Sequence, residues 1–319
     1  MVTRYEKPIS RHAMSAVAAD LRTRLFQSIA DRFPSPAIEH SLAMRRLWKT
    51  LFYLTGPRAP FVMRTARYRL WVDPLRRKDI ARSILHRGCY EPIETAIVLA
   101  RLKPGMTVID VGANIGHYAM IAAAAIGPEG RVVAFEPDAE NHAALAANLA
   151  LNGFAQATAE RLALGAKPGE AILYRDQANR GGHSLEAANV QKPGGEARVT
   201  VTTLDAYVAE LLAGRRVGFI KIDVQGSEAE VLAGASATLA NHGPELLVEF
   251  WPHGIRARGA EPMMLIERIL GLGYRIAVVD RNHPGHVRPL ADADALRRID
   301  LSDPQAYANL LFTKDNAGR

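Results

Sequence analysis

The run Thr107-Val108-Ile109-Asp110-Val111-Gly112-Ala113-Asn114-Ile115-Gly116-His117-Tyr118 decides the fold of this chain. An apolar, β-branched segment ends in an acid, turns on two glycines and continues into a small-residue helix predicted to reach Ile126. This is the layout of a strand, a nucleotide-binding loop and a helix whose N-terminus faces the ligand. The sequence therefore predicts a site for an adenosine-containing cofactor at this turn.

The glycine spacing narrows the choice of cofactor. A triphosphate loop requires Lys and then Ser or Thr after its second glycine, and His117 stands where the Lys would be. A dinucleotide loop reads Gly-x-Gly-x-x-Gly, whereas Asn114 takes the middle place here. A ligand without phosphate, whose carboxylate rests on the amides of a helix N-terminus, fits better, and S-adenosylmethionine is that ligand.

A second acid follows 26 residues after Asp110. The segment 131–135 reads as a strand, and Glu136 stands at its end, directly before Pro137. We expect Glu136 to accept hydrogen bonds from both ribose hydroxyls of the cofactor, each worth about 1.5–3 kcal/mol in a dry site. The structural alternative for Glu136 is that it only caps the helix that follows. The alternative for the two glycines is that they form a tight strand-to-helix turn that binds no ligand.

Several further runs have a recognisable pattern, namely Gly88 to Pro92, Asp110 to Gly116, Phe135 to Pro137 with Asn148 and Asn152, Thr203 to Asp205, Ile220 to Glu228 and Val231 to Ala235. Together they resemble the FkbM family of S-adenosylmethionine-dependent methyltransferases, over about residues 79–314. The run Lys-Ile-Asp-Val-x-Gly-x-Glu is its most specific part, and Gln225 departs from it, since the family usually has Glu there. The resemblance implies methyl transfer to a hydroxyl oxygen, typically on a sugar or polyketide-like small molecule.

The candidate cofactor-binding residues lie on the glycine turn, after the second strand, before the core domain and after a later strand. They are Tyr90, Glu91, Asp110, Gly112, Ala113, Asn114, Gly116, Glu136, Pro137 and Asp223. Tyr90 and Glu91 are expected to fold over the methionine end of the cofactor.

The catalytic candidates follow from where ligands bind. Methyl transfer from a sulfonium is an in-line displacement, so the protein mainly positions the acceptor oxygen and removes its proton. Ligands of open α/β sheets lie beyond the carboxyl ends of the strands, which selects Asp223, Glu249 and His253. The alternatives are a helix cap for Asp223 and a plain surface loop for His253. Lys221 is expected to pair with a carboxylate, and Glu228 to have a structural role in the first turn of a helix.

Asp223, Glu249 and His253 together would make a plausible set of carboxylate and imidazole metal ligands. No His-x-x-x-His or Cys-x-x-Cys spacing supports it. We therefore expect no required metal.

The alternation of elements predicts an α/β, doubly wound, mostly parallel seven-stranded Rossmann-like methyltransferase sheet. Strands are expected at 106–111, 131–135, 155–161, 217–222, 245–250, 274–280 and 307–313, with helices at 115–126, 138–151, 203–213, 227–240 and 262–271. The segment 165–202 interrupts this rhythm and reads as an inserted hairpin whose tip lies over the cofactor edge. Residues 1–78 are assigned to a basic, mainly helical extension and residues 79–319 to the methyltransferase domain.

Charge is unevenly distributed along the chain. Residues 1–90 hold 18 Lys or Arg and 6 Asp or Glu, although the net charge of the whole chain is only +7. Amphipathic helices predicted at 14–33 and 38–54 carry this charge. They are suited to peripheral contact with a membrane or with an acidic acceptor. The alternative is that they form a solvated helical extension. No stacking pattern of aromatic and basic residues accompanies it, so no DNA partner is expected. An RNA ribose 2′-hydroxyl acceptor and a non-catalytic cofactor-fold protein remain the alternative functions.

Composition agrees with a globular enzyme. The chain has 319 residues, 48% of them hydrophobic and 23% charged. Cys89 is the single cysteine, so no intramolecular disulfide can form, and the N-terminal segment has no apolar stretch typical of a signal peptide. A cytoplasmic location is expected.

Overall fold

The structure is a computed structural model that describes residues 42–64, 67–75, 80–81, 83–84, 89–212, 214–280, 283, 285–299 and 301–314. The chain divides into two compact units, one ending at Pro92 and the other beginning at Ile93. The helix expected over 14–33 lies outside the described residues. The domain boundary expected between residues 78 and 79 stays a prediction.

The described elements of the first unit are a helix and a hairpin, α3 (Leu42–Thr55), β1 (Phe61–Arg64) and β2 (Arg69–Val72). The two strands are antiparallel. Trp48 and Phe52 of α3 are buried, whereas Leu47, Tyr53 and Leu54 are exposed. This helix is therefore amphipathic and leaves one apolar strip uncovered.

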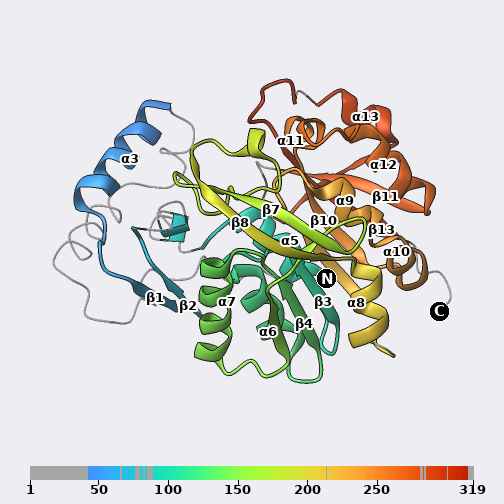
Figure 1. The fold of residues 1–319 in the computed structure, drawn as a ribbon, viewed down its shortest axis with the longest axis horizontal. Coiled ribbons are helices and arrows are strands. Elements are labelled where there is room, and N and C mark those ends of the chain that lie inside the picture. The colour runs from blue at the N-terminus through green and yellow to red at the C-terminus, as the bar shows by residue number, and fades with distance from the viewer. Residues whose placement is uncertain are drawn as a thin grey trace. The chain divides into compact units, whose positions relative to one another are not determined.

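The second unit is built on an eight-stranded sheet in the order β12 (Val287–Leu290), β11 (Tyr274–Val279), β13 (Ala308–Lys314), β10 (Glu245–Phe250), β9 (Val217–Ile222), β3 (Thr107–Val111), β4 (Arg131–Phe135) and β5 (Ala157–Glu160). The strands from β10 to β5 are parallel, and β13 runs antiparallel between β10 and β11 (Figure 1). The predicted α/β, mostly parallel class is confirmed.

The sheet has one strand more than the seven expected. The extra strand, β12, is only four residues long, contains Pro289 and pairs with β11 alone. Because proline has no N–H to donate to a strand ladder, it is confined to sheet edges and weakens the sequence signal of a strand.

The helices of this unit are α5 (Pro92–Arg101), α6 (His117–Ile126), α7 (Ala139–Asn152), α8 (Leu204–Leu211), α9 (Glu228–Ala233), α10 (Ser236–His242), α11 (Pro252–Ala257), α12 (Pro262–Gly271) and α13 (Ala293–Arg297). The single helix expected over 227–240 is in fact two, α9 and α10. The backbone N–H groups of Ala237 and Thr238 donate to the Asp205 carboxylate of α8, which gives α10 its own N-terminal cap. A cap from a distant element leaves no mark in the local sequence.

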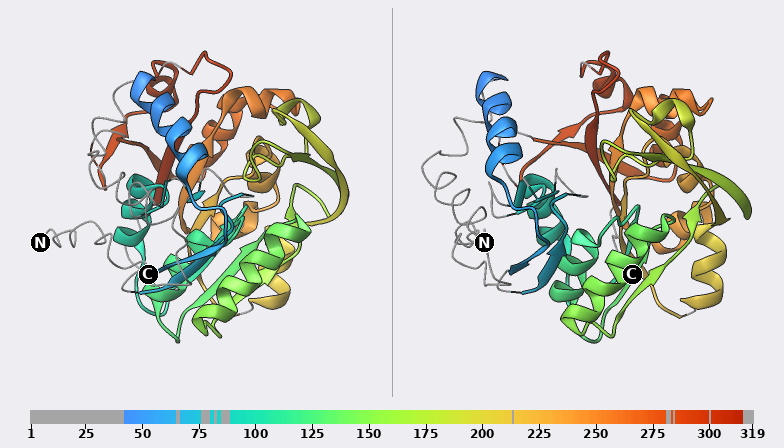
Figure 2. Two further views of the ribbon diagram at one scale, coloured as in Figure 1. Left: turned by 90° about the vertical axis from the view of Figure 1, so that its left-hand side faces the viewer. Right: turned by 60° about the vertical axis from the view of Figure 1, so that its left-hand side comes forward.

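The two faces of the sheet have different partners. Successive strand residues point to opposite faces, so Val111, Ile222 and Val248 face one way and Asp110 and Lys221 the other. The first face forms a continuous apolar core with α8, α9, α10 and α12. Tyr118 of α6 covers Lys221 on the opposite face. Helices thus cover both faces (Figures 1 and 2).

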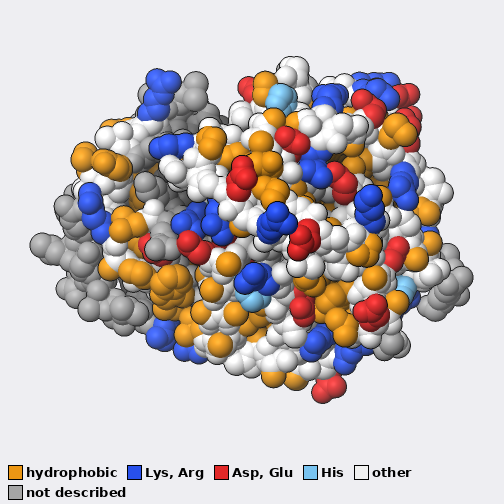
Figure 3. All heavy atoms as spheres, in the orientation of Figure 1, with side chains coloured by type: hydrophobic (Ala, Val, Ile, Leu, Met, Phe, Trp, Pro, Cys, Tyr) orange, Lys and Arg blue, Asp and Glu red, His pale blue; other side chains and the backbone are white. Residues whose placement is uncertain are grey.

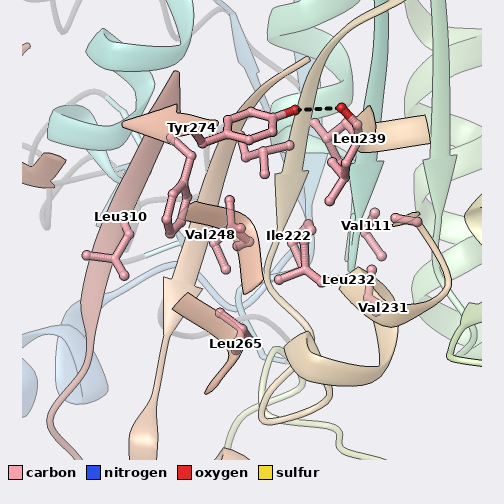
Figure 4. Close-up of a cluster of buried hydrophobic side chains, with 14 of the residues drawn as sticks. Val111, Ile222, Val231, Leu232, Leu239, Val248, Leu265, Tyr274 and Leu310 are labelled. Carbon is pink, nitrogen blue, oxygen red and sulfur yellow. Dashed lines mark hydrogen bonds between the residues drawn. The ribbon is translucent and has the colours of Figure 1, made fainter. Parts of the chain in front are cut away.

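Figure 4 shows part of this core, where Val111, Ile222, Val248 and Leu310 of the strands pack against helix side chains. The Tyr274 hydroxyl donates to the Leu239 carbonyl at 3.3 Å, so the one polar atom of this aromatic side chain is satisfied.

The predicted insertion is confirmed as a small separate sheet of β6 (Ala163–Leu164), β8 (Pro193–Thr202) and β7 (Gly169–Asp176), with a short 3₁₀ helix, η2 (Ala187–Asn189). β7 and β8 form an antiparallel hairpin. The loop between them carries Ser184 and Asn189, which contact the loop after β9 and helix α11.

The surface shown in Figure 3 mixes Lys and Arg with Asp and Glu over the second unit. That face therefore has no single-sign charge patch of the kind that binds nucleic acid backbones. None of the helices in the described ranges has the length and apolar content needed to cross a bilayer.

Phe312 tests the placement of β13 inside the sheet, because it is fully buried between Leu246 of β10 and Ile276 of β11. We expect Phe312→Ala to lower the free energy of unfolding by about 3–5 kcal/mol through the cavity it leaves. Met264→Ala is the control, because Met264 is 66% exposed and should change stability by about 0.5 kcal/mol or less. Urea unfolding measures both, and a loss below about 1 kcal/mol for Phe312→Ala would contradict this topology.

Candidate functional site

The turn after β3 is fixed by left-handed backbone and by a close approach. Gly112, Asn114 and Gly116 have φ of 80°, 51° and 93°. The N–H groups of Gly112 and Ala113 donate to the Phe135 carbonyl at 3.0 and 2.9 Å. A Cβ on Gly112 would lie 1.8 Å from the Asp223 carbonyl oxygen, so only glycine fits there.

Glu136 fastens this turn to the end of β4. Its Oε2 accepts from the Asn114 N–H at 2.9 Å, and its Oε1 accepts from the Asp138 N–H at 2.9 Å and from Asn141 Nδ2 at 3.4 Å. Burial raises the pKa of this carboxyl to about 7. Asp138, rather than Glu136, caps α7, because its Oδ1 accepts from the N–H groups at the start of the helix.

Asp110 and Lys221 are direct cross-strand partners at the ends of β3 and β9. Asp110 is 1% exposed, and among the described residues neither of its carboxylate oxygens has a hydrogen bond of normal geometry. Burial raises the pKa of Asp110 to about 6, and the charge of Lys221 opposes that shift. The Lys221 Nζ lies 4.6 Å from the Tyr118 ring centroid, a contact that sequence reasoning missed.

The loop after β9 collects the acceptor-side candidates. Lys221 Nζ donates to Asp223 Oδ2 at 3.1 Å, as its predicted pairing requires. Gln225 Nε2 donates to Asp223 Oδ1 at 2.8 Å and to Glu249 Oε1 at 2.9 Å. The structure therefore brings Asp223 and Glu249 together, at the end of the sheet that also holds the glycine turn.

His253 is placed differently from these two acids. It is exposed on α11, and its ring centroid lies 6.1 Å from that of Trp251. Within the described residues no hydrogen bond or ion pair joins it to Asp223 or Glu249. Its part in catalysis stays a prediction. So does the cofactor contact of Tyr90 and Glu91, which belong to the first unit.

The model of the methyltransferase FkbM domain matches residues 110–276. The chain belongs to the FkbM methyltransferase family. Family membership confirms the predicted methyltransferase class, with S-adenosylmethionine as the cofactor.

The individual relatives are distant from this FkbM-family chain. It is 22% identical over 183 residues to Methyltransferase 1 of Beauveria bassiana (strain ARSEF 2860), covering 52% of this chain and 72% of that protein. The structure of methyltransferase FkbM from Methylobacillus flagellatus KT aligns with a TM-score of 0.43 and 17% identity. The alignment covers 91% of this chain but only 58% of the Methylobacillus chain. An S-adenosylmethionine-dependent O-methyltransferase from Thermotoga maritima aligns with a TM-score of 0.38 and 15% identity, over 85% and 81% of the two chains.

The residues around the glycine turn fit the cofactor of the FkbM family. Asp110 is a buried carboxylate beside a helix N-terminus, and a cationic ammonium group is the ligand chemistry that would satisfy its oxygens. Glu136 retains lone pairs for hydroxyl donors, since each carboxylate oxygen accepts more than one hydrogen bond. The predicted turn residues Gly112, Ala113 and Asn114 lie between these two acids.

The insertion docks on both sides of this site. Ser184 Oγ and Asn189 Nδ2 donate to the Gln225 carbonyl at 2.8 and 3.1 Å. On the cofactor side, Arg175 Nε donates to Asp138 Oδ2 at 2.8 Å, and Asn141 Nδ2 donates to the Arg180 carbonyl at 3.2 Å. The sequence predicts an insertion with its tip over the cofactor edge, but these hydrogen-bond partners are set by tertiary packing and have no sequence signal.

Metal ligands are not grouped in the described part of the chain. No set of three or more His, Cys, Asp or Glu there is arranged to hold an ion, so the set of Asp223, Glu249 and His253 is not assembled. The expectation of a metal-independent enzyme stays a prediction.

Glu228 holds the loop that carries Asp223. It is fully buried, and its Oε1 accepts from the N–H groups of Val224 and Gly226 at 3.2 and 3.1 Å. Burial raises its pKa from 4.5 to about 7. A carboxyl shifted in this direction stabilises the fold below its unfolded-state pKa and loses that contribution as the pH rises through about 7.

We therefore expect the wild type to lose stability between about pH 5 and pH 8, and Glu228→Gln to flatten this dependence by on the order of 2–3 kcal/mol. Glutamine resembles the protonated acid and stays neutral. Glu267→Gln on the exposed part of α12 is the control and should keep the wild-type slope. Urea unfolding at both pH values gives the slopes, and an unchanged slope in Glu228→Gln would refute the buried-acid assignment.

Proposed function

We propose that this chain transfers a methyl group from S-adenosylmethionine to a hydroxyl oxygen of a sugar, a glycan or a related small molecule. One observation carries the proposal. Two buried acids, Asp110 and Glu136, end neighbouring parallel strands and flank a turn whose backbone only glycine can follow at position 112. The acceptor-side acid Asp223 directly follows β9, and Glu249 lies near the end of β10, on the next strands of the same sheet.

On the cofactor side, each group has a role that suits its chemistry. Asp110 accepts hydrogen bonds from the ammonium group of the methionine tail, and the turn of Gly112 to Gly116 receives the tail carboxylate at the N-terminus of α6. Glu136 accepts hydrogen bonds from the ribose hydroxyls, and Pro137 and Ala113 supply apolar contact beside them. Because Glu136 also holds the Asn114 N–H, ribose binding and the shape of the turn are linked.

On the acceptor side, the protein's task is positioning and proton removal. The cofactor supplies a methyl group already activated by its sulfonium. Asp223, which is held by the hydrogen bond from Lys221 Nζ, would accept a hydrogen bond from the acceptor hydroxyl and take its proton as the methyl group is transferred. Alignment of the two reactants contributes about 7–11 kcal/mol, more than the base itself. Glu249 binds a second hydroxyl of the acceptor.

The chemistry of this loop favours a hydroxyl acceptor. Enzymes that methylate the amino nitrogen of nucleic acids place Asn or Asp, two prolines and an aromatic residue after the fourth strand, and this loop reads Asp223-Val224-Gln225-Gly226. Carboxylates and an amide are instead the groups with which proteins bind sugar hydroxyls. This supports a carbohydrate or similar polyol over a nucleobase.

The first unit is proposed to contact a membrane surface or an acidic acceptor through helix α3. Arg46, Leu47, Tyr53 and Leu54 are exposed on α3, in the part of the chain with the largest excess of basic residues. An apolar strip with basic neighbours suits an anionic membrane surface or an acidic acceptor.

Glu136 provides the test of the cofactor site. We expect Glu136→Ala to weaken S-adenosylmethionine binding at least about tenfold, because charge-assisted hydrogen bonds to both ribose hydroxyls are lost. Glu136→Gln, which keeps the size and one acceptor oxygen, should lose less. Glu140→Ala, whose side chain pairs with Arg180 on the surface, is the matched control and should bind normally. Isothermal calorimetry measures all four proteins, and near-wild-type affinity in Glu136→Ala would remove the ribose assignment.

A second measurement, of turnover, distinguishes the catalytic roles proposed for Asp223 and His253. We expect Asp223→Asn to lower kcat by about 100-fold or more, the usual contribution of a general base, with the cofactor Kd within about threefold of wild type. His253→Ala should lose less than about tenfold, because within the described residues no hydrogen bond or ion pair joins its exposed ring to the two acids. Release of S-adenosylhomocysteine with a panel of monosaccharides and glycosides gives the rates. Unchanged turnover in both variants would discard both residues as catalysts.

A further inference from the structure

The insertion reaches across the carboxyl end of β3. Its loop contacts residues that follow β4 and residues that follow β9, and these two strands flank β3 in the sheet. On the β4 side, Asn141 Nδ2 donates to the Arg180 carbonyl at 3.2 Å. On the β9 side, Ser184 Oγ donates to the Gln225 carbonyl at 2.8 Å. The segment from Arg180 to Ser184 therefore spans the end of β3, where the glycine turn begins.

Residues 179–182, called the tip turn below, are shaped by their own hydrogen bonds. The Gly182 N–H donates to the Asn179 carbonyl at 2.9 Å, and the Gly181 N–H donates to Asn179 Oδ1 at 2.9 Å. At the base of the turn, Asp176 Oδ1 accepts from the Asn179 N–H at 3.1 Å. The tip turn can therefore dock and detach as one piece, without losing its internal bonds.

The tip turn lies against the glycine turn. A Cβ on Gly181 would be 3.2 Å from Asn114 Nδ2, closer than an ordinary van der Waals contact. Asn114 is the residue of the glycine turn whose N–H donates to Glu136 Oε2 at 2.9 Å. The insertion thus approaches the glycine turn at the point that Glu136 fastens.

Asn141 links the tip turn to Glu136 by a second route. Its Nδ2 donates to Glu136 Oε1 at 3.4 Å as well as to the Arg180 carbonyl. Both partners are acceptors, which determines the end of the amide that carries the hydrogens. Asn141 is 2% exposed, and its Oδ1 has no hydrogen-bond partner among the described residues. A buried amide with an unsatisfied oxygen costs stability, so the two acceptors that its NH₂ group joins explain its position better than the stability of α7 does.

We propose that Asn141 is a positioning residue that couples cofactor binding to the docking of the tip turn. Ribose hydroxyls bound to Glu136 hold this carboxylate in place, Glu136 orients the Asn141 amide, and the amide holds the Arg180 carbonyl. The tip turn then covers bound S-adenosylmethionine and detaches before S-adenosylhomocysteine leaves. This inference rests on the proposed role of Glu136 in ribose binding. Because coupling is reciprocal, bound cofactor fastens the tip turn, and a change that detaches the tip turn weakens cofactor binding.

Hydrogen exchange of the full chain, followed by mass spectrometry, tests the coupling without any substitution. We expect saturating S-adenosylmethionine to slow exchange in the peptide 177–184 by about fivefold or more, the lower end of common coupling energies. A peptide from α10 is the internal control and should exchange at the same rate with and without cofactor. Equal exchange of 177–184 in the two conditions would overturn the inference.

Two variants test the route of the coupling. Gly181→Val places a side chain against Asn114 and should detach the tip turn, raising the cofactor Kd by about fivefold and removing the protection of 177–184 at saturating cofactor. Asn141→Ala should have both effects. Gly271→Val is the matched control, because Gly271 is exposed and a Cβ there would meet nothing within 4 Å, and it should bind as wild type. A merely structural role for Asn141 would lower the Tm and leave the protection by cofactor unchanged, and that result would overturn the inference.

The double variant shows whether the two changes act through one event. Either change alone releases the tip turn, so Asn141→Ala with Gly181→Val should bind the cofactor within about twofold of Asn141→Ala. Losses that multiply would contradict the coupling. If Asn141→Ala folds poorly, the wild-type exchange and Gly181→Val still decide, since Gly181 is exposed.

The inference and the proposed function fail in different ways. If wild type does not bind S-adenosylmethionine in the calorimeter, or if Glu136→Ala binds it normally, the proposed cofactor site fails and the inference fails with it. If wild type binds the cofactor through Glu136 but the exchange of 177–184 does not respond, only the role of Asn141 is refuted.

Discussion

The structure depends on the close approach of the turn after β3 to the loop after β9. The Asp223 N–H donates to the Val111 carbonyl at 3.0 Å, and the Asp223 carbonyl lies where a Cβ on Gly112 would be. This contact fixes the glycine turn and the loop after β9 to each other through backbone atoms. Any side chain at position 112 would push the two loops apart. Gly112 is therefore required because it has no Cβ, and not because it makes the turn flexible.

The same edge of the sheet concentrates charge that the fold does not need for stability. Burial raises the pKa values of Asp110, Glu136 and Glu228, so each of these acids makes the folded state less stable as they ionise. A sheet built only for stability would have apolar residues at these positions. Perturbed acids gathered at the carboxyl ends of parallel strands are what a binding or catalytic site requires, and the stability they cost is offset by the apolar core on the opposite face.

The sequence was sufficient for the parts of the fold that local pattern controls. The β3 turn, the acid at the end of β4 and the alternation of strands and helices all follow from residue order, because burial on both faces and left-handed turns leave clear signatures. β12, the separation of α9 from α10 and the docking of Asn189 could not be predicted in the same way. Each depends on a partner far along the chain, such as Asp205 for α10 and Gly254 for Asn189.

Gln225 shows how these two kinds of information combine. The family pattern marked position 225 as a departure, but a glutamine in place of a glutamate has no meaning until its neighbours are known. The insertion supplies them, because Ser184 and Asn189 hold the Gln225 carbonyl and thereby aim its amide at Asp223 and Glu249. The hairpin between β7 and β8 is therefore part of the site through the geometry it imposes. Its contribution is to keep a strained residue where one neutral NH₂ group can serve two acids.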